Sequence, residues 1–128
     1  MKIETDTVQL SDKERQLIER IDAYICENLE EKISLSYLSS RFNISGTSIK
    51  RLFKLHHGEP VYTYIRCKKM EEAARLLVET GDSILAIAGM VGYENGSKFA
   101  KAFHDVMGMT PKSYRERKRK ECVNDPNE

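Results

Sequence analysis

The chain has 128 residues, 40% of them hydrophobic and 32% charged, with a formal net charge of +1. This length fits one domain or two small lobes that share a connector. No apolar run approaches the roughly 18 residues of a membrane span, and no signal peptide opens the chain. Cys26, Cys67 and Cys122 are odd in number and form no CxxC pair, so we expect a cytoplasmic protein without a disulfide or zinc framework.

The small net charge conceals an uneven distribution along the chain. Residues 1–33 carry a net charge of −4, residues 34–120 carry +8 and residues 121–128 carry −3. A basic segment flanked by acidic ends is typical of a phosphate-binding surface, although solvated helix faces are often basic as well.

The first predicted element is an amphipathic helix. Residues 1–10 show no periodicity and are expected to form a flexible lead-in. Ser11 and Glu14 then match the S-x-x-E capping box that marks a helix start. A single apolar stripe follows over about five turns, at Leu17, Ile18, Ile21, Ile25 and Leu29.

A helix-turn-helix pattern completes the first lobe, which we place at residues 11–59. Ser34 is the expected cap of a short helix that ends at Asn43, a residue type that tolerates positive φ. Ser45 is the expected cap of the next helix, which Gly58 ends. A unit of this kind presents its second helix outward, where it can enter a DNA major groove.

Residues 60–80 are predicted to form one long connector helix that ends before Gly81. Twenty helical residues span about 30 Å, close to the ~34 Å of one turn of B-DNA. The segment therefore has the length of a rigid spacer between two DNA-reading helices, and the alternative is an ordinary core helix.

The same pattern recurs in a second lobe, which we place at residues 81–120. Ser83 is the expected cap of the first helix, Gly92 provides the turn, and Asn95 or Ser97 caps the second helix.

A last helix is expected to begin at Thr110-Pro111, because proline is tolerated in the first turn. Its basic run, after Tyr114, is as compatible with a solvated face as with phosphate contacts. Residues 121–128 form a polar tail.

The repeat extends beyond the two turns. Pairs 50 residues apart are Phe53/Phe103, Gly58/Gly108 and Tyr64/Tyr114, and pairs 49 apart are Leu38/Ile87, Phe42/Val91 and Asn43/Gly92. The chain thus carries two copies of one supersecondary unit, and the second turn is one residue longer. We predict an all-α fold with two helix-turn-helix lobes.

Several stretches resemble the signature of the AraC/XylS family of bacterial transcription regulators. They are Val91 to Phe103, Gly108 to Arg115, Ser45 to Gly58, and the connector from Tyr64 to Leu77. The resemblance covers about residues 12–117. It implies a DNA-binding domain of seven helices, with two helix-turn-helix lobes joined by a long helix, that binds promoters next to RNA polymerase, usually for activation.

The predicted recognition helices differ in their exposed side chains. In the first, Arg51 can pair with guanine through its planar fork, whereas Lys50 can serve a base or a phosphate. In the second, Gly96 and Ala100 offer no side-chain hydrogen bond to a base. This helix is therefore expected to add affinity more than discrimination, although close packing on a thymine methyl is an alternative.

The resemblance and this side-chain chemistry together give a set of DNA contacts. The expected base-contacting residues are Thr47, Lys50, Arg51, Gly96, Ser97 and Lys101. The expected phosphate-contacting residues are Ser45, Lys54, Ser83, Asn95, Lys98, Thr110 and Lys112.

No catalytic arrangement, cofactor motif or phosphate loop is evident in the sequence. His56, His57 and His104 have no further ligand at metal-binding spacing, so we expect neither an enzyme nor a metal protein.

The favoured function is a sequence-specific regulator that binds double-stranded DNA as a monomer across two adjacent major grooves. The alternative is a protein-interaction module, directed at RNA polymerase or another regulator, with weak DNA binding.

Overall fold

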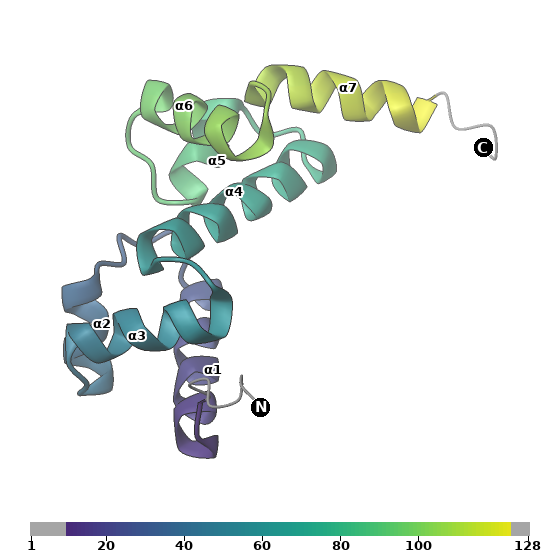
Figure 1. The fold of residues 1–128 in the computed structure, drawn as a ribbon. Helices are drawn as coiled ribbons and strands as arrows, with labels where there is room; N and C mark the ends of the chain where they lie inside the picture. Colours follow the sequence, from purple (N-terminus) through teal and green to yellow (C-terminus); the bar gives the residue numbers. More distant parts are fainter. Residues whose placement is uncertain (1–9, 124–128) are drawn as a thin grey trace, which may run out of the picture. The chain divides into compact units, whose positions relative to one another are not determined.

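The computed structural model describes residues 10–123, and these form seven α-helices and no β-strand (Figure 1). The helices are α1 (Asp12–Glu27), α2 (Leu35–Phe42), α3 (Gly46–His57), α4 (Val61–Glu79), α5 (Ile84–Met90), α6 (Gly96–Met107) and α7 (Pro111–Val123). The predicted all-α fold with its helix order is confirmed.

The helix starts follow the capping signals in the sequence. In the capping box of α1, the Glu14 N–H donates to Ser11 Oγ (3.1 Å) and the Ser11 N–H donates to Glu14 Oε1 (3.0 Å). The helices α2, α3, α5 and α6 begin at side-chain caps formed by Ser34, Ser45, Ser83 and Asn95, respectively. Each cap accepts a hydrogen bond from a backbone N–H that has no partner within its helix.

One expectation about α1 is wrong. The apolar stripe was extended to Leu29, but the helix ends at Glu27 and Asn28 is its C-terminal cap. The Asn28 N–H donates to Ile25 O (3.1 Å), and its side-chain amide donates to Tyr24 O (2.8 Å). These bonds satisfy carbonyls of the last turn and end the helix two residues before Leu29.

The described residues divide into two compact units. The first unit comprises residues 10–28 and Ile33–Ile65, and the second comprises Leu29–Lys32 and residues 66–123. The helix α4 begins in the first unit and continues without interruption into the second.

The first unit packs α3 against α1 and α2. Its buried apolar side chains come from all three helices and from the start of α4: Ile18, Ile21, Ile25, Leu38, Ile49, Leu52, Phe53, Val61, Tyr64 and Ile65. Phe53 meets Tyr64 edge-on, with ring centroids 5.3 Å apart. Edge-to-face packing of this kind holds the C-terminal half of α3 in place.

The second unit repeats this packing around Phe99 and Phe103 of α6, which are fully buried. Phe103 meets Tyr114 edge-on at 5.5 Å, as Phe53 meets Tyr64.

Arg115, the first residue of the basic run, donates to the carbonyl oxygens of Leu77 (2.9 Å), Thr80 (3.3 Å) and Asp82 (2.6 Å). This arginine satisfies the last carbonyls of α4 and the loop after it, so its role in the fold is structural.

Both turns use a left-handed residue. Asn43 has φ 56° and Gly92 has φ 84°. The next residue then donates its N–H to the carbonyl five positions earlier: Ile44 to Ser39 O (3.2 Å) and Tyr93 to Ala88 O (2.8 Å). The two turns thus reverse the chain through the same hydrogen bond.

A buried lysine secures the turn of the second unit. Lys69, on α4, is 8% exposed. Its ammonium donates to the backbone carbonyls of Leu29, Glu31 (2.8 Å) and Val91 (3.1 Å). Desolvation lowers the pKa of Lys69 from its ordinary value, and Glu30 and Glu31 oppose this shift.

The glycine at position 92 leaves space for this arrangement. A Cβ atom there would lie 2.9 Å from Lys69 Nζ and 3.0 Å from Glu30 O, and the φ of 84° would strain any L-residue with a side chain.

The first prediction concerns Lys69. Lys69→Met keeps most of the side-chain volume but leaves three carbonyl oxygens without their donor. It should therefore lower the free energy of unfolding of the second unit by about 1–3 kcal/mol in urea titrations. Lys68→Met is the matched control, because Lys68 pairs with Glu71 at the surface (3.5 Å). Equal stability of the two variants would contradict this role.

Candidate nucleic-acid interface

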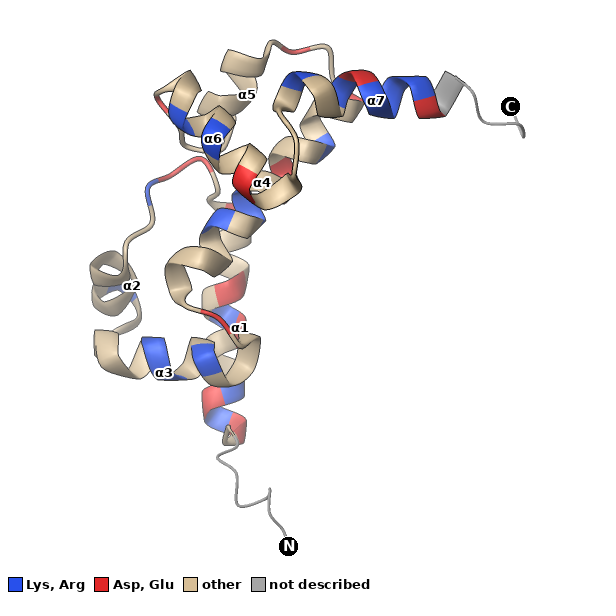
Figure 2. Ribbon diagram, turned by 45° about the horizontal axis from the view of Figure 1, so that its top comes forward, with Lys and Arg blue, Asp and Glu red and all other residues tan. Residues whose placement is uncertain are grey.

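The helix α3 separates a buried face from a polar one. Ile49, Leu52 and Phe53 are buried, whereas four of the predicted DNA contacts on α3 are exposed: Thr47, Lys50, Arg51 and Lys54. The helix contains no acidic residue, and its Lys and Arg segments stand out in Figure 2. An amphipathic helix of this kind can present cations and hydroxyls to DNA while its apolar side anchors it.

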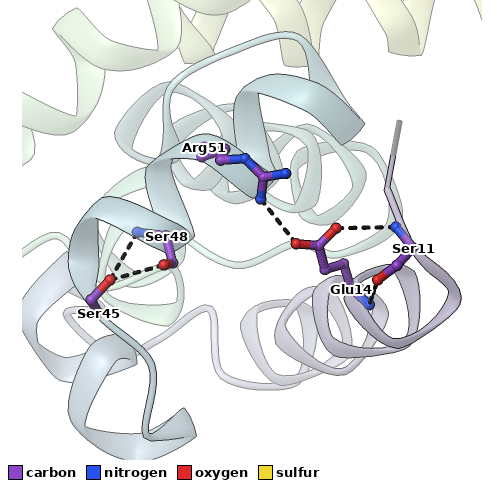
Figure 3. Close-up of polar contacts among 5 residues, drawn as sticks. All are labelled: Ser11, Glu14, Ser45, Ser48 and Arg51. Carbon is purple, nitrogen blue, oxygen red and sulfur yellow. Dashed lines mark hydrogen bonds and ion pairs between the residues drawn. The ribbon is translucent and has the colours of Figure 1, made fainter. Parts of the chain in front are cut away.

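Arg51, the expected base reader, contacts an acidic residue of α1 (Figure 3). Arg51 Nη1 donates to Glu14 Oε2 at 3.0 Å, with side-chain exposures of 46% and 33%. A guanidinium has five N–H donors, so one bond to Glu14 leaves others available for a base. Glu14 therefore limits the positions of the Arg51 guanidinium without using all its donors.

The carboxylate of Glu14 has two roles, in the capping box and in the Arg51 pair. The backbone N–H of Ser11 and then the Arg51 guanidinium hold the pKa of Glu14 below its ordinary value of 4.5. Because the folded pKa lies below the unfolded one, the ionised carboxylate favours folding above pH 4.5. This contribution is lost as the pH falls through the folded pKa.

The helix α6 presents a less varied surface. Phe99, Ala102 and Phe103 are buried, and Ser97, Lys98 and Lys101 are exposed. The Lys101 ammonium pairs with Asp105 one turn later at 3.1 Å, and its side chain is 79% exposed. An exposed pair of this type is weak enough to exchange for a phosphate or a base. Gly96 is half-buried at the start of α6.

Four of the predicted phosphate contacts lie at helix starts. Ser45, Ser83 and Asn95 each accept a backbone N–H three residues later, at 3.0–3.1 Å. Thr110 Oγ1 accepts the Ser113 N–H in the same way (3.1 Å), at the start of α7. Ser45 Oγ also donates to Ser48 Oγ at 2.9 Å (Figure 3). These side chains fix the ends of helices, and the other three candidates, Lys54, Lys98 and Lys112, are exposed cations.

Glu14 was not among the residues expected at this site. Glu14 lies 37 positions before Arg51. The S-x-x-E capping box was a sufficient explanation for a glutamate at this position. The one signal in the sequence was its spacing one turn before Ile18, in line with the apolar stripe of α1.

A protein-family profile described as a helix-turn-helix domain matches residues 38–117. The chain is 34% identical to the multiple antibiotic resistance protein MarA of Escherichia coli over 92 residues, which is 72% of each protein. It is 29% identical to the transcriptional activator RhaS of Pectobacterium carotovorum over 107 residues, 84% of this chain and 38% of RhaS.

The fold is also that of known structures. The C-terminal domain of the response regulator YesN from Fusobacterium nucleatum has a TM-score of 0.74 and 33% identity, covering 78% of this chain and 98% of that domain. The DNA-binding domain of AdpA, solved with a target DNA, has a TM-score of 0.77 at 23% identity and covers 89% and 99%, respectively.

The chain belongs to the AraC/XylS family. The resemblance read from the sequence is thereby confirmed, and as a family member the chain is a DNA-binding transcription regulator. RhaS and the similar LumQ of Photobacterium leiognathi carry the names of transcription regulators and not of enzymes. Within residues 10–123 of this AraC/XylS regulator, no helix is long and apolar enough to cross a membrane.

The second prediction concerns the pKa of Glu14. In Arg51→Ala, the pKa should rise toward 4.5 without reaching it, because the larger contribution from Ser11 remains. A titration of the Glu14 side chain followed by NMR measures this directly, with Lys50→Ala as the control on the same helix. An unchanged pKa in Arg51→Ala would show that the pair does not form in solution.

Proposed function

We propose that this chain reads double-stranded DNA as a monomer, with α3 and α6 entering two adjacent major grooves, and thereby regulates promoters. The observation that carries the proposal is the repeated geometry of the two units. In each, a left-handed turn precedes a capped helix that has three buried apolar residues on one side and exposed lysines on the other. Each unit therefore has one helix suited to a groove.

The first unit supplies most of the sequence discrimination in this proposal. Thr47, Lys50 and Arg51 contact bases, and Ser45 and Lys54 contact phosphates. Arg51 has the donor geometry for guanine, and its bond to Glu14 restricts the guanidinium before DNA arrives. Restricting a side chain in advance lowers the entropy lost on binding.

The second unit supplies affinity and a smaller part of the readout. Gly96, Ser97 and Lys101 are the proposed base contacts. Its proposed phosphate contacts are Ser83, Asn95, Lys98, Thr110 and Lys112. Of the three proposed base contacts, Lys101 alone carries a charge, and Gly96 has no side chain. Most of the binding free energy from the second unit should therefore come from charge attraction that is independent of sequence.

The helix α4 is the proposed spacer. Its 19 residues span about 28 Å, which is shorter than the ~34 Å between successive turns of a groove. A rigid spacer of this length seats both recognition helices only if the duplex bends toward the protein. Bending over 20–30 base pairs costs roughly 1–6 kcal/mol, which contacts from the second unit can offset.

The proposal also includes promoter activation, RNA polymerase as a partner and a cytoplasmic location. RhaS is named a transcriptional activator, which supports promoter activation by this chain. RNA polymerase as a partner is proposed from the family resemblance alone. A cytoplasmic location follows from the DNA target. Neither Cys26 nor Cys67 takes part in a disulfide within the described residues.

The third prediction separates readout from affinity. Arg51→Ala should cost about 1–3 kcal/mol on the preferred site and relax discrimination at one or two base pairs. Lys98→Ala should weaken binding to all sequences similarly and reduce the salt slope by about one. Gel-shift titrations on specific and random duplexes at several salt concentrations measure both effects. Lys13→Ala, an exposed residue of the acidic helix α1, is the control.

The assignment is inverted if Lys98→Ala changes the preferred sequence and Arg51→Ala does not. Equal affinity of the unaltered chain for specific and random duplexes would instead favour the protein-interaction alternative.

The fourth prediction tests the spacer. Circular-permutation gel shifts should show mobility that depends on the position of the site, because the bound duplex is bent. Four residues, Gly-Gly-Ser-Gly, inserted after Ile65 interrupt α4 at the boundary between the units and leave both cores intact. This variant should lose the bend and most of the affinity, while circular dichroism should show that the helices of both units remain folded. Mobility that is independent of site position in the unaltered chain would exclude a rigid spacer.

A further inference from the structure

Three metal-binding side chains from α1 and the end of α3 meet in the first unit, and none of them is a predicted DNA contact. One ligand atom each from Asp22, His56 and His57 lies within 4.8 Å of the other two. His57 Nε2 is 2.8 Å from Asp22 Oδ1 and 3.1 Å from Asp22 Oδ2. Asp22 comes from α1, and both histidines come from the last turn of α3.

The surroundings hold one imidazole in a defined orientation. The ring of His57 stacks on Tyr64, with centroids 4.0 Å apart, and packs against Phe53 at 5.2 Å. Its side chain is 17% exposed and that of Asp22 is 21% exposed. Two of the three ligands are therefore preorganised and partly shielded from water, which lowers the cost of ordering them around an ion.

His56 is the exposed member of the group. Its ring centroid lies 4.7 Å from that of His57. Ligand atoms around a tetrahedral ion with bonds of about 2.0–2.1 Å are separated by about 3.3 Å. The ligand atoms lie within 4.8 Å of one another, so the largest separation must shrink by about 1.5 Å. A change of the His56 rotamer can bring its nitrogen this much closer while α1 and α3 stay in place.

We propose that Asp22, His56 and His57 bind a divalent transition-metal ion of the zinc class. Two imidazole nitrogens and one carboxylate oxygen are ligands that such ions prefer, whereas Ca²⁺ and Mg²⁺ favour sites made of oxygen alone. Three protein ligands leave one tetrahedral position for water. The ion takes the place of the hydrogen bond between His57 Nε2 and the Asp22 carboxylate.

Metal binding at this place stabilises the first unit. It joins the middle of α1 to the C-terminal turn of α3, the helix that carries Arg51. This site could not be predicted from the sequence, because Asp22 lies 35 positions before His57 and only the packing of α3 on α1 brings them together. The expectation of no metal site considered only residues close together in the sequence, where His56 and His57 have no third ligand at metal-binding spacing.

The plain alternative is an Asp22–His57 ion pair that needs neither His56 nor a metal. His56 distinguishes the two, because an exposed side chain can be removed without disturbing the fold. His104 is the matched control: it is also exposed, on α6, and among the described residues it belongs to no group of three metal-binding side chains.

The test measures Zn²⁺ and Co²⁺ binding to the full chain by calorimetry and by thermal unfolding. The unaltered chain and His104→Ala should bind one ion per chain and gain the same thermal stability. His56→Ala should bind roughly tenfold more weakly or worse. Asp22→Asn should lose the same binding. The Co²⁺ spectrum should lack thiolate-to-cobalt charge transfer, because the site contains no cysteine.

Two results would overturn the proposal. One is His56→Ala binding the ion as tightly as His104→Ala. The other is a Co²⁺ spectrum dominated by thiolate charge transfer, which would place the ion at a cysteine. DNA binding by His56→Ala, measured in parallel without added metal, should equal that of the unaltered chain, so failure here leaves the proposed function standing.

Discussion

The left-handed turn within each unit is the constraint on which the interface depends. Asn43 and Gly92 adopt positive φ, and the residue after each closes a hydrogen bond to a carbonyl five positions earlier. The direction of α3 and α6 is set at these two positions. Without the reversal, the apolar faces of α3 and α6 could not reach their cores while their polar faces remain exposed.

The two turns reach this geometry in different ways. Asparagine tolerates left-handed backbone at some cost, and around Asn43 no buried cation is needed. At position 92 glycine is required twice over, by its φ and by the approach of Lys69 and Glu30. The second unit thus combines a longer turn with a buried ammonium that holds three backbone carbonyls. The second turn is thus held from α4, whereas in the first the Ser39 hydroxyl of α2 donates to Ile44 O (2.7 Å).

Local signals in the sequence were sufficient for most helix starts. The caps at Ser11, Ser34, Ser45 and Ser83 act within three residues, so each could be predicted without knowing the fold. The repeat of aromatic and glycine positions predicted two units with the same packing, and Tyr64 and Tyr114 do occupy equivalent places. Where the signal was ambiguous, as for the cap of α6, both Asn95 and Ser97 were compatible and the structure selects Asn95.

Pairings between distant residues could not be predicted in the same way. Glu14 with Arg51, and Asp22 with His57, join positions 35 or more apart and depend on how α3 packs against α1. Lys69 was an ordinary basic residue in the sequence, because nothing local indicates that its ammonium is buried among carbonyls. The end of α1 was also missed, since the apolar residue Leu29 continues the helical period although Asn28 ends the helix.

The central claim is that one chain carries both DNA-reading helices. Selection of bound sites from a random duplex library, followed by native mass spectrometry of the complex, tests it most directly. The account predicts one chain per duplex and an asymmetric site of two unlike boxes about 10 base pairs apart. A palindromic site occupied only by two chains would contradict it.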